Sequence, residues 1–133
     1  MRVGLDIDPQ RLAGRRVLIV EDEPLIAIDH ADAVSRAGAD VVGLCADVAH
    51  AMAYLESVAV DVAVVDFVLL DRNSDVLQAA LEKRGVPYVV VTAYPTVLVR
   101  RSSNQRILHK PVNPDVLCAT VHAACAEADA ARG

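Results

Sequence analysis

The chain has 133 residues, with 13 lysines and arginines against 18 aspartates and glutamates, which gives a formal net charge of −5. This length fits one domain, and a hydrophobic content of 54% is enough for a buried core and excludes global disorder. The acidic balance and the scarcity of aromatic residues, with no tryptophan, argue against a protein that binds nucleic acid.

The sequence contains no segment expected to enter or cross a membrane. No apolar run reaches the ~18 residues of a membrane-spanning helix, and residues 1–14 lack the apolar stretch of a signal peptide. We therefore expect a cytoplasmic protein without a membrane partner. The three cysteines, Cys45, Cys118 and Cys125, have no metal-ligand spacing, so we expect reduced thiols packed in the core.

Five apolar segments alternate with segments of helical periodicity after an N-terminal arm at residues 1–14. Short, continuous apolar runs are typical of strands buried on both faces of a parallel sheet. The predicted strands are residues 15–20, 40–45, 60–67, 86–93 and 106–110. Residues 95–105, between the last two strands, are the poorest helix candidate, because Pro95 opens a polar stretch of low helix propensity.

The predicted helices begin at capping residues, which are Asp47, Ser74 and Asn113 for the second, third and last helix. Gly38 and Gly85 end the first and third helices. Each predicted helix has an apolar face expected to point into the core. In the first helix this face is Ile26, His30, Ala33, Val34 and Ala37, and in the second it is Val48, Ala51, Met52 and Leu55. In the third helix it is Val76, Leu77, Ala80 and Leu81, and in the last it is Leu117, Val121, Ala124 and Cys125. Strands alternating with helices predict an α/β fold, with a parallel sheet covered on both faces.

Polar side chains stand at the carboxyl ends of the predicted strands, where such sheets bind ligands. They are Glu21 and Asp22 after the first strand, Asp66 at the third, Thr92 at the fourth and Lys110 at the fifth. Crowded carboxylates repel one another unless a cation intervenes, and Mg²⁺ with oxygen ligands fits best. A carboxylate beside Mg²⁺, an ammonium group and a hydroxyl group is also equipped to accept a phosphoryl group.

The segments VLIVEDEPLIA, VAVVDF, VVVTAY and ILHKPV resemble the four signature blocks of the response-regulator receiver domain of two-component signalling. The resemblance covers residues 15 to about 128, and we assign the domain to residues 15–130. EDEPLIAIDHADAV and VVVTAY further resemble small stand-alone response regulators of alphaproteobacterial stress and light signalling. The resemblance implies a flavodoxin-like three-layer sandwich whose five-stranded parallel sheet has the order 2-1-3-4-5.

The resemblance also implies a role for each strand-end residue. Asp66 resembles the phosphoacceptor, Thr92 the switch hydroxyl and Lys110 the lysine that contacts the phosphate. Glu21 and Asp22 resemble the acidic pair that binds Mg²⁺ together with Asp66 and the main-chain carbonyl of Val68. The Lys110–Pro111 peptide bond is expected to be cis.

We therefore expect a phosphoacceptor protein, and not an enzyme, with Mg²⁺ as its cofactor. The expected partners are a histidine kinase or a histidine phosphotransfer protein and a downstream protein target, reached by direct contact or by phosphorelay. Residue 133 follows closely on the last predicted helix, so no output domain is expected unless the chain was cut from a larger protein. The sequence leaves a monomer and a homodimer open.

Two departures from the family pattern favour an alternative, a pseudo-receiver that binds other proteins but is not phosphorylated. Ile107 stands where the family usually has an aromatic residue, and residues 67–74 lack the proline and glycine common in that loop. A Mg²⁺-dependent phosphatase is disfavoured, because Val68, two residues after Asp66, offers no general acid.

The first predicted helix also carries a candidate docking surface for the histidine kinase. Leu25, Ile28 and Asp29 are predicted to point away from the core beside the acidic pair, and adjacent exposed apolar residues suit a helical partner. His30 is predicted to be a packed core histidine and His109 a solvated one.

Overall fold

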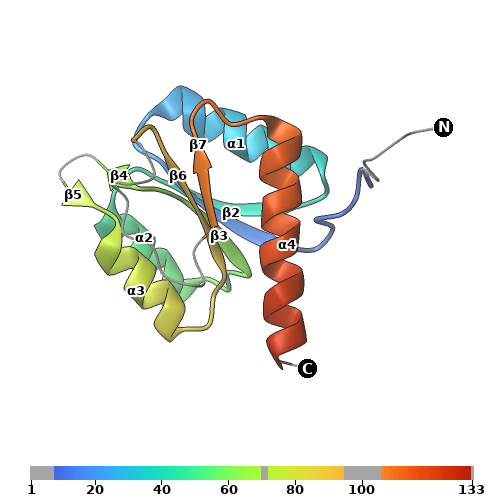
Figure 1. Cartoon of the computed structure of the whole chain (residues 1–133). Coiled ribbons are helices and arrows are strands. Elements are labelled where there is room, and N and C mark those ends of the chain that lie inside the picture. Colours follow the sequence, from blue (N-terminus) through green and yellow to red (C-terminus); the bar gives the residue numbers. More distant parts are fainter. Residues whose placement is uncertain (1–7, 70–71, 95–105, 133) are drawn as a thin grey trace.

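The computed structural model describes residues 8–69, 72–94 and 106–132, which form a three-layer α/β sandwich (Figure 1). The central sheet consists of five parallel strands in the order β2-β1-β3-β6-β7. They are β1 (Arg16–Val20), β2 (Asp40–Cys45), β3 (Val62–Asp66), β6 (Tyr88–Thr92) and β7 (Arg106–His109). Because β6 and β7 are the fourth and fifth predicted strands, the predicted order 2-1-3-4-5 is confirmed.

The three middle strands consist almost wholly of buried residues. Every residue of β3 and β6 is buried, as are Val17–Val20 of β1. The parallel register places Asp66 beside Val91 and Thr92 beside His109. The polar residues at the ends of these strands therefore lie at one edge of the sheet.

In the described part of the chain, two helices cover each face of the sheet (Figure 1). Helices α1 (Pro24–Arg36) and α4 (Pro114–Arg132) pack on one face, and α2 (Val48–Ser57) and α3 (Asp75–Lys83) on the other. Leu12 from the N-terminal arm is fully buried in the core beneath α1 and α4. Its N–H donates to the carbonyl of Ala37 at 2.9 Å, so part of the predicted arm packs into the domain.

The predicted inner face of α4 is confirmed, because its four predicted residues are all buried. In α2, Val48 and Ala51 are buried, and Met52 and Leu55 are partly buried against the same core. In α1, Ala27 is buried, while Ile26 is only half-buried. The prediction for α3 is wrong at Val76, which is exposed, and it missed Gln78, which is buried. Gln78 faces inward because its amide donates to the buried Ser74 hydroxyl at 3.0 Å.

Two of the three predicted N-caps are confirmed. The Asp47 carboxylate accepts from the His50 N–H at 2.8 Å, and the Asn113 amide oxygen accepts from the Asp115 N–H at 2.8 Å. Ser74 occupies the N-cap position of α3 but makes no side-chain cap hydrogen bond, since its hydroxyl is bound to Gln78.

A short hairpin follows Asp66 where the sequence predicts only a loop. Strands β4 (Val68–Leu69) and β5 (Arg72–Asn73) pair antiparallel, and the buried Leu69 side chain anchors the hairpin in the core beneath α2 and α3. The Ser74 N–H closes the hairpin by donating to the Phe67 carbonyl at 2.8 Å. The weak helix predicted at residues 95–105 lies outside the described residues.

The three cysteines are buried and free of disulfides, as predicted. Burial raises the pKa of each thiol, and that of Cys45 to about 11. Among the helices of the described segments, none combines the length and the hydropathy needed to cross a membrane.

Candidate functional site

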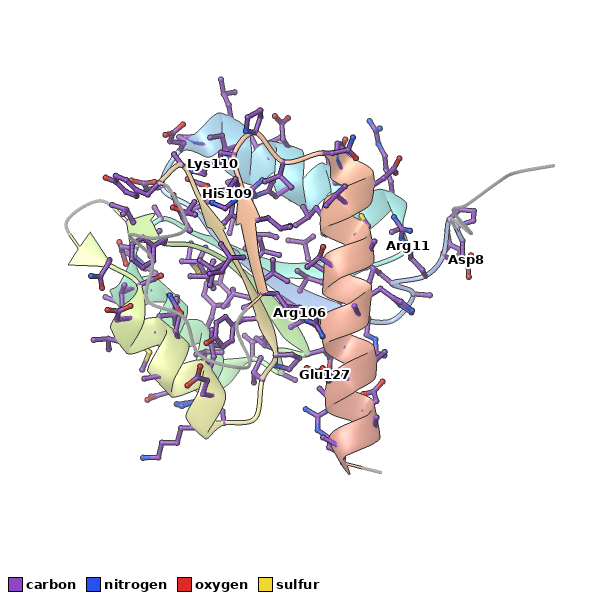
Figure 2. The ribbon with its side chains drawn as sticks, viewed as in Figure 1. Asp8, Arg11, Arg106, His109, Lys110 and Glu127 are labelled. Carbon is purple, nitrogen blue, oxygen red and sulfur yellow. The ribbon has the colours of Figure 1, made fainter. Side chains whose placement is uncertain are left out.

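The carboxyl edge of the sheet gathers side chains from four different strand ends. Asp66 ends β3 and Thr92 ends β6, and both are buried. Glu21 follows β1 directly, and Lys110 follows β7 directly. Figure 2 shows Lys110 and His109 together at this end of β7. The structure thus brings together residues that lie up to 89 positions apart in the sequence.

Lys110 joins two of the carboxylates. Its Nζ lies 3.0 Å from Asp66 Oδ2 and 3.1 Å from Glu21 Oε1. Both acids are almost completely buried, so the ammonium group is held by charge-assisted contacts that water screens little. The backbone fixes the position of Lys110, because its N–H donates to the Thr92 carbonyl at 2.8 Å and the Lys110–Pro111 bond is cis, as expected.

The acidic residues form a compact cluster with more negative charge than Lys110 can balance. Carboxylate oxygens of Glu21, Asp22 and Asp66 lie within 4.8 Å of one another. Burial and then the proximity of Asp66 raise the pKa of Glu21 to about 7, against the opposing effect of Lys110. Burial disfavours the charged form of Lys110, but hydrogen bonds and charges of Asp66 and Glu21 outweigh it and raise the pKa of the lysine.

This donor set suits a hard divalent cation. All candidate ligands are oxygens, and three carboxylates lie together with a single ammonium group, that of Lys110. The Val68 N–H donates to Asp66 Oδ1 at 3.2 Å, which places the backbone of Val68 against the acceptor carboxylate. Glu21, Asp22 and Asp66 are therefore the described side chains that could hold Mg²⁺, and the ligand role of the Val68 carbonyl stays a prediction.

Thr92 is completely buried, and its hydroxyl oxygen accepts the Tyr94 N–H at 3.0 Å. The Tyr94 ring meets Phe67 edge to face, with ring centroids 6.4 Å apart and an interplanar angle of 82°. Ile107 is half-buried and packs into the core beneath α2 and α3.

Sequence reasoning missed the contact between Phe67 and Tyr94. The signal for it was present, since Phe67 follows the end of β3, Tyr94 follows the end of β6, and parallel neighbours carry such residues to the same edge. Of the two histidines weighed from the sequence, His30 is buried in α1 as predicted, and His109 is exposed.

Comparison with known proteins places this geometry in a family. Residues 17–122 match the response regulator receiver domain, and the chain belongs to that family. The transcriptional regulatory protein PdtaR of Mycobacterium tuberculosis is 34% identical over 92 residues, which are 68% of this chain and 45% of PdtaR.

Solved structures agree with this assignment. The response regulator PhyR from Brucella abortus superposes with a TM-score of 0.83 at 29% identity, over 94% of this chain and 53% of PhyR. SdrG from Sphingomonas melonis Fr1 superposes with a TM-score of 0.71 at 33% identity, over 84% of this chain and 96% of SdrG. The chain thus spans about half the length of PdtaR and PhyR.

Proposed function

We propose that the protein is a phosphorylatable receiver, which accepts a phosphoryl group from a phosphohistidine donor on Asp66. The observation that carries the proposal is the position of Lys110 Nζ, 3.0 Å from Asp66 Oδ2. Strand β6 ends in Thr92 at the same edge of the sheet. An ammonium group beside a buried carboxylate, with a hydroxyl group at the same edge of the sheet, supplies groups that support phosphoryl transfer.

In the proposed reaction, a carboxylate oxygen of Asp66 attacks phosphorus while the bond from phosphorus to the donor histidine breaks. The histidine nitrogen takes up the electron pair of that bond, and an acyl phosphate forms. Lys110 stabilises the negative charge on the phosphoryl oxygens, and the Thr92 hydroxyl exchanges its contact with the Tyr94 N–H for one with a phosphoryl oxygen. A Mg²⁺ ion held by Glu21, Asp22, Asp66 and Val68 would supply further positive charge.

Asp66 is consumed as the acceptor in this scheme, so the protein acts as a signalling component and not as an enzyme that turns over a substrate. We assign the receiver to residues 15–130, preceded by the arm at residues 1–14, and we place the protein in the cytoplasm. PdtaR is a transcriptional regulatory protein and PhyR is a response regulator, which supports a downstream protein target for this chain.

The donor kinase or phosphotransfer protein is proposed to dock beside the acceptor. Leu25 and Ile28 lie on the outer side of α1, three to seven residues after Glu21 and Asp22, and both are exposed. Exposed aliphatic side chains so close to the acceptor suit a helical partner that must bring its phosphohistidine within bonding distance of Asp66.

The experiment that tests the proposal is incubation with acetyl phosphate and Mg²⁺, followed by intact-mass measurement. We expect a gain of one phosphoryl group per chain, which Asp66→Asn abolishes and the remote substitution Asp40→Asn leaves unchanged. No mass gain in the wild type would favour the pseudo-receiver, and release of many phosphates per chain without a stable adduct would indicate a hydrolase.

A further inference from the structure

The start of α1 carries negative charge that its surroundings in the described structure do not balance. Glu23 and Asp29 are exposed, and neither carboxylate forms an ion pair with another described residue. The sequence has no lysine or arginine from residue 17 to residue 35. Lys110 is already held by two carboxylates of the acceptor site, so its charge is not available to this surface.

Acidic residues on other parts of the described surface have arginine partners. These pairs are Asp32 with Arg36 at 2.8 Å, Asp61 with Arg16 at 3.0 Å, Asp129 with Arg15 at 2.6 Å and Glu127 with Arg106 at 3.3 Å. Asp32 lies on α1 itself, one helical turn after Ile28. The unbalanced charge of α1 is therefore concentrated at the end of the helix that follows the acidic pair of the acceptor site.

The two free carboxylates flank the exposed aliphatic side chains of α1. Leu25, Ile28 and Asp29 share one side of the helix, because residues three and four positions apart are neighbours on a helix surface. Glu23 is the N-cap residue, two positions before Leu25. An apolar centre with a charged rim is the usual composition of a surface that binds another protein.

We propose that Glu23 and Asp29 select the phosphodonor protein by its charge. The donor fits this surface when its own helix presents lysines or arginines around an apolar contact. The inference rests on the proposed function, because the selected partner is the protein that must reach Asp66. It goes beyond the apolar contact of Leu25 and Ile28, since it assigns the sign of the donor's charge and two residues that determine specificity.

Charges at the rim of an interface act mainly on the encounter of the two proteins. They accelerate association with a partner of opposite charge and disfavour partners of like charge. Contacts between exposed charges are weak singly, so we expect loss of both carboxylates to slow transfer roughly 3- to 30-fold at ~0.05 M salt. At ~0.5 M salt the difference should shrink to less than about twofold, because salt screens exposed charges.

The test uses autophosphorylated histidine kinases and phosphotransfer proteins from the source organism, from which the fastest donor to the wild type is chosen. Its kcat/KM for transfer is measured at both salt concentrations with Glu23→Gln combined with Asp29→Asn. The matched control combines Asp40→Asn with Glu56→Gln. Asp40 and Glu56 are exposed at the start of β2 and on α2, so the control changes the net charge equally but at other places.

The charge-neutral pair should be slower at low salt, whereas the control should transfer at the wild-type rate. Asp29→Lys should be slower than Asp29→Asn, because it turns attraction of a basic donor into repulsion. Labelling by acetyl phosphate should not fall in any of these variants, which shows that each one folds and keeps its acceptor site.

Acetyl phosphate also separates this inference from the proposed function. A wild-type protein that acetyl phosphate does not label would overturn the proposed function, and one labelled by acetyl phosphate but by no protein donor would overturn both. The charge inference alone fails if the wild type is labelled but neutralising Glu23 and Asp29 leaves transfer unchanged, or if the control slows equally. It also fails if the fastest donor carries a net negative charge on the helix that holds its phosphohistidine.

Discussion

The proposed docking surface on α1 yields a prediction that separates recognition of the kinase from chemistry at Asp66. Leu25 is 78% exposed, and Ile28 on the next turn is 55% exposed. We expect Leu25→Glu to slow phosphoryl transfer from a histidine kinase and to leave labelling by acetyl phosphate unchanged. A small phosphodonor needs only the acceptor site, whereas a protein donor must also cover the outer side of α1.

The size of the effect follows from the exposure of Leu25. Complete burial of a leucine side chain is worth ~1.5–3 kcal/mol, and 78% of the Leu25 surface remains available to a partner. Loss of that contact therefore raises the free energy of the transition state for transfer by roughly 1.2–2.3 kcal/mol. This corresponds to a fall of roughly 7- to 50-fold in kcat/KM for transfer.

The assay uses autophosphorylated histidine kinases from the source organism, from which one that labels the wild-type protein is chosen. Single-turnover transfer to the wild type, to Leu25→Glu and to Val76→Glu is then followed with radiolabelled phosphate. Val76 is 57% exposed but lies on α3, on the opposite face of the sheet, so it is a matched control that should transfer at the wild-type rate. Equal slowing by Val76→Glu, or slower acetyl phosphate labelling of Leu25→Glu, would refute the reasoning.

Four further predictions concern the metal, the lifetime of the phosphate, the arm and the thiols. Asp22→Asn should lose Mg²⁺ binding and Mg²⁺-dependent labelling, measured by titration and intact mass, because it removes one carboxylate of the cluster. Val68→Asn combined with Tyr94→Ala should speed loss of the phosphate about tenfold, since asparagine can orient an attacking water and alanine opens its path, worth ~1.4 kcal/mol. Leu12→Ala should lower the free energy of unfolding in urea by ~2–3 kcal/mol, because it deletes three buried carbons and leaves a cavity. Cys45, with its pKa raised to about 11, should react with a disulfide reagent at neutral pH only after unfolding and faster as the pH rises, because only the thiolate attacks.

Each of these predictions has an outcome that contradicts it. Asp22→Asn labelled at the wild-type rate would show that Asp22 is not a ligand, and a wild-type phosphate lost within seconds would disprove the role of Val68 and Tyr94. A loss below ~1 kcal/mol in Leu12→Ala would mean that the arm is not part of the core. Rapid modification of Cys45 in the folded protein would show that the thiol is accessible.

Local sequence patterns determined the fold of this protein because its parallel sheet is buried on both faces. Continuous apolar strands such as Val62–Val65 have no other stable environment, and helices with one apolar face must cover them. The same logic located Asp66, Thr92 and Lys110, since each directly follows or ends an apolar run, and parallel strands carry such residues to one edge. Asp47 and Asn113 were predictable as N-caps because a cap is a contact within a few residues.

Only the tertiary structure decided the features that depend on contacts between distant segments. Leu12 was predicted to belong to an N-terminal arm outside the domain, but it is buried in the core beneath α1 and α4. On α3, Gln78 is buried and bonded to Ser74 while Val76 is exposed, and helical periodicity alone does not specify this choice of inner face. The charge balance of the acceptor site likewise depends on the 3.0 Å contact between Lys110 and Asp66, residues 44 positions apart, because electrostatic energy follows distance in space and not separation along the chain.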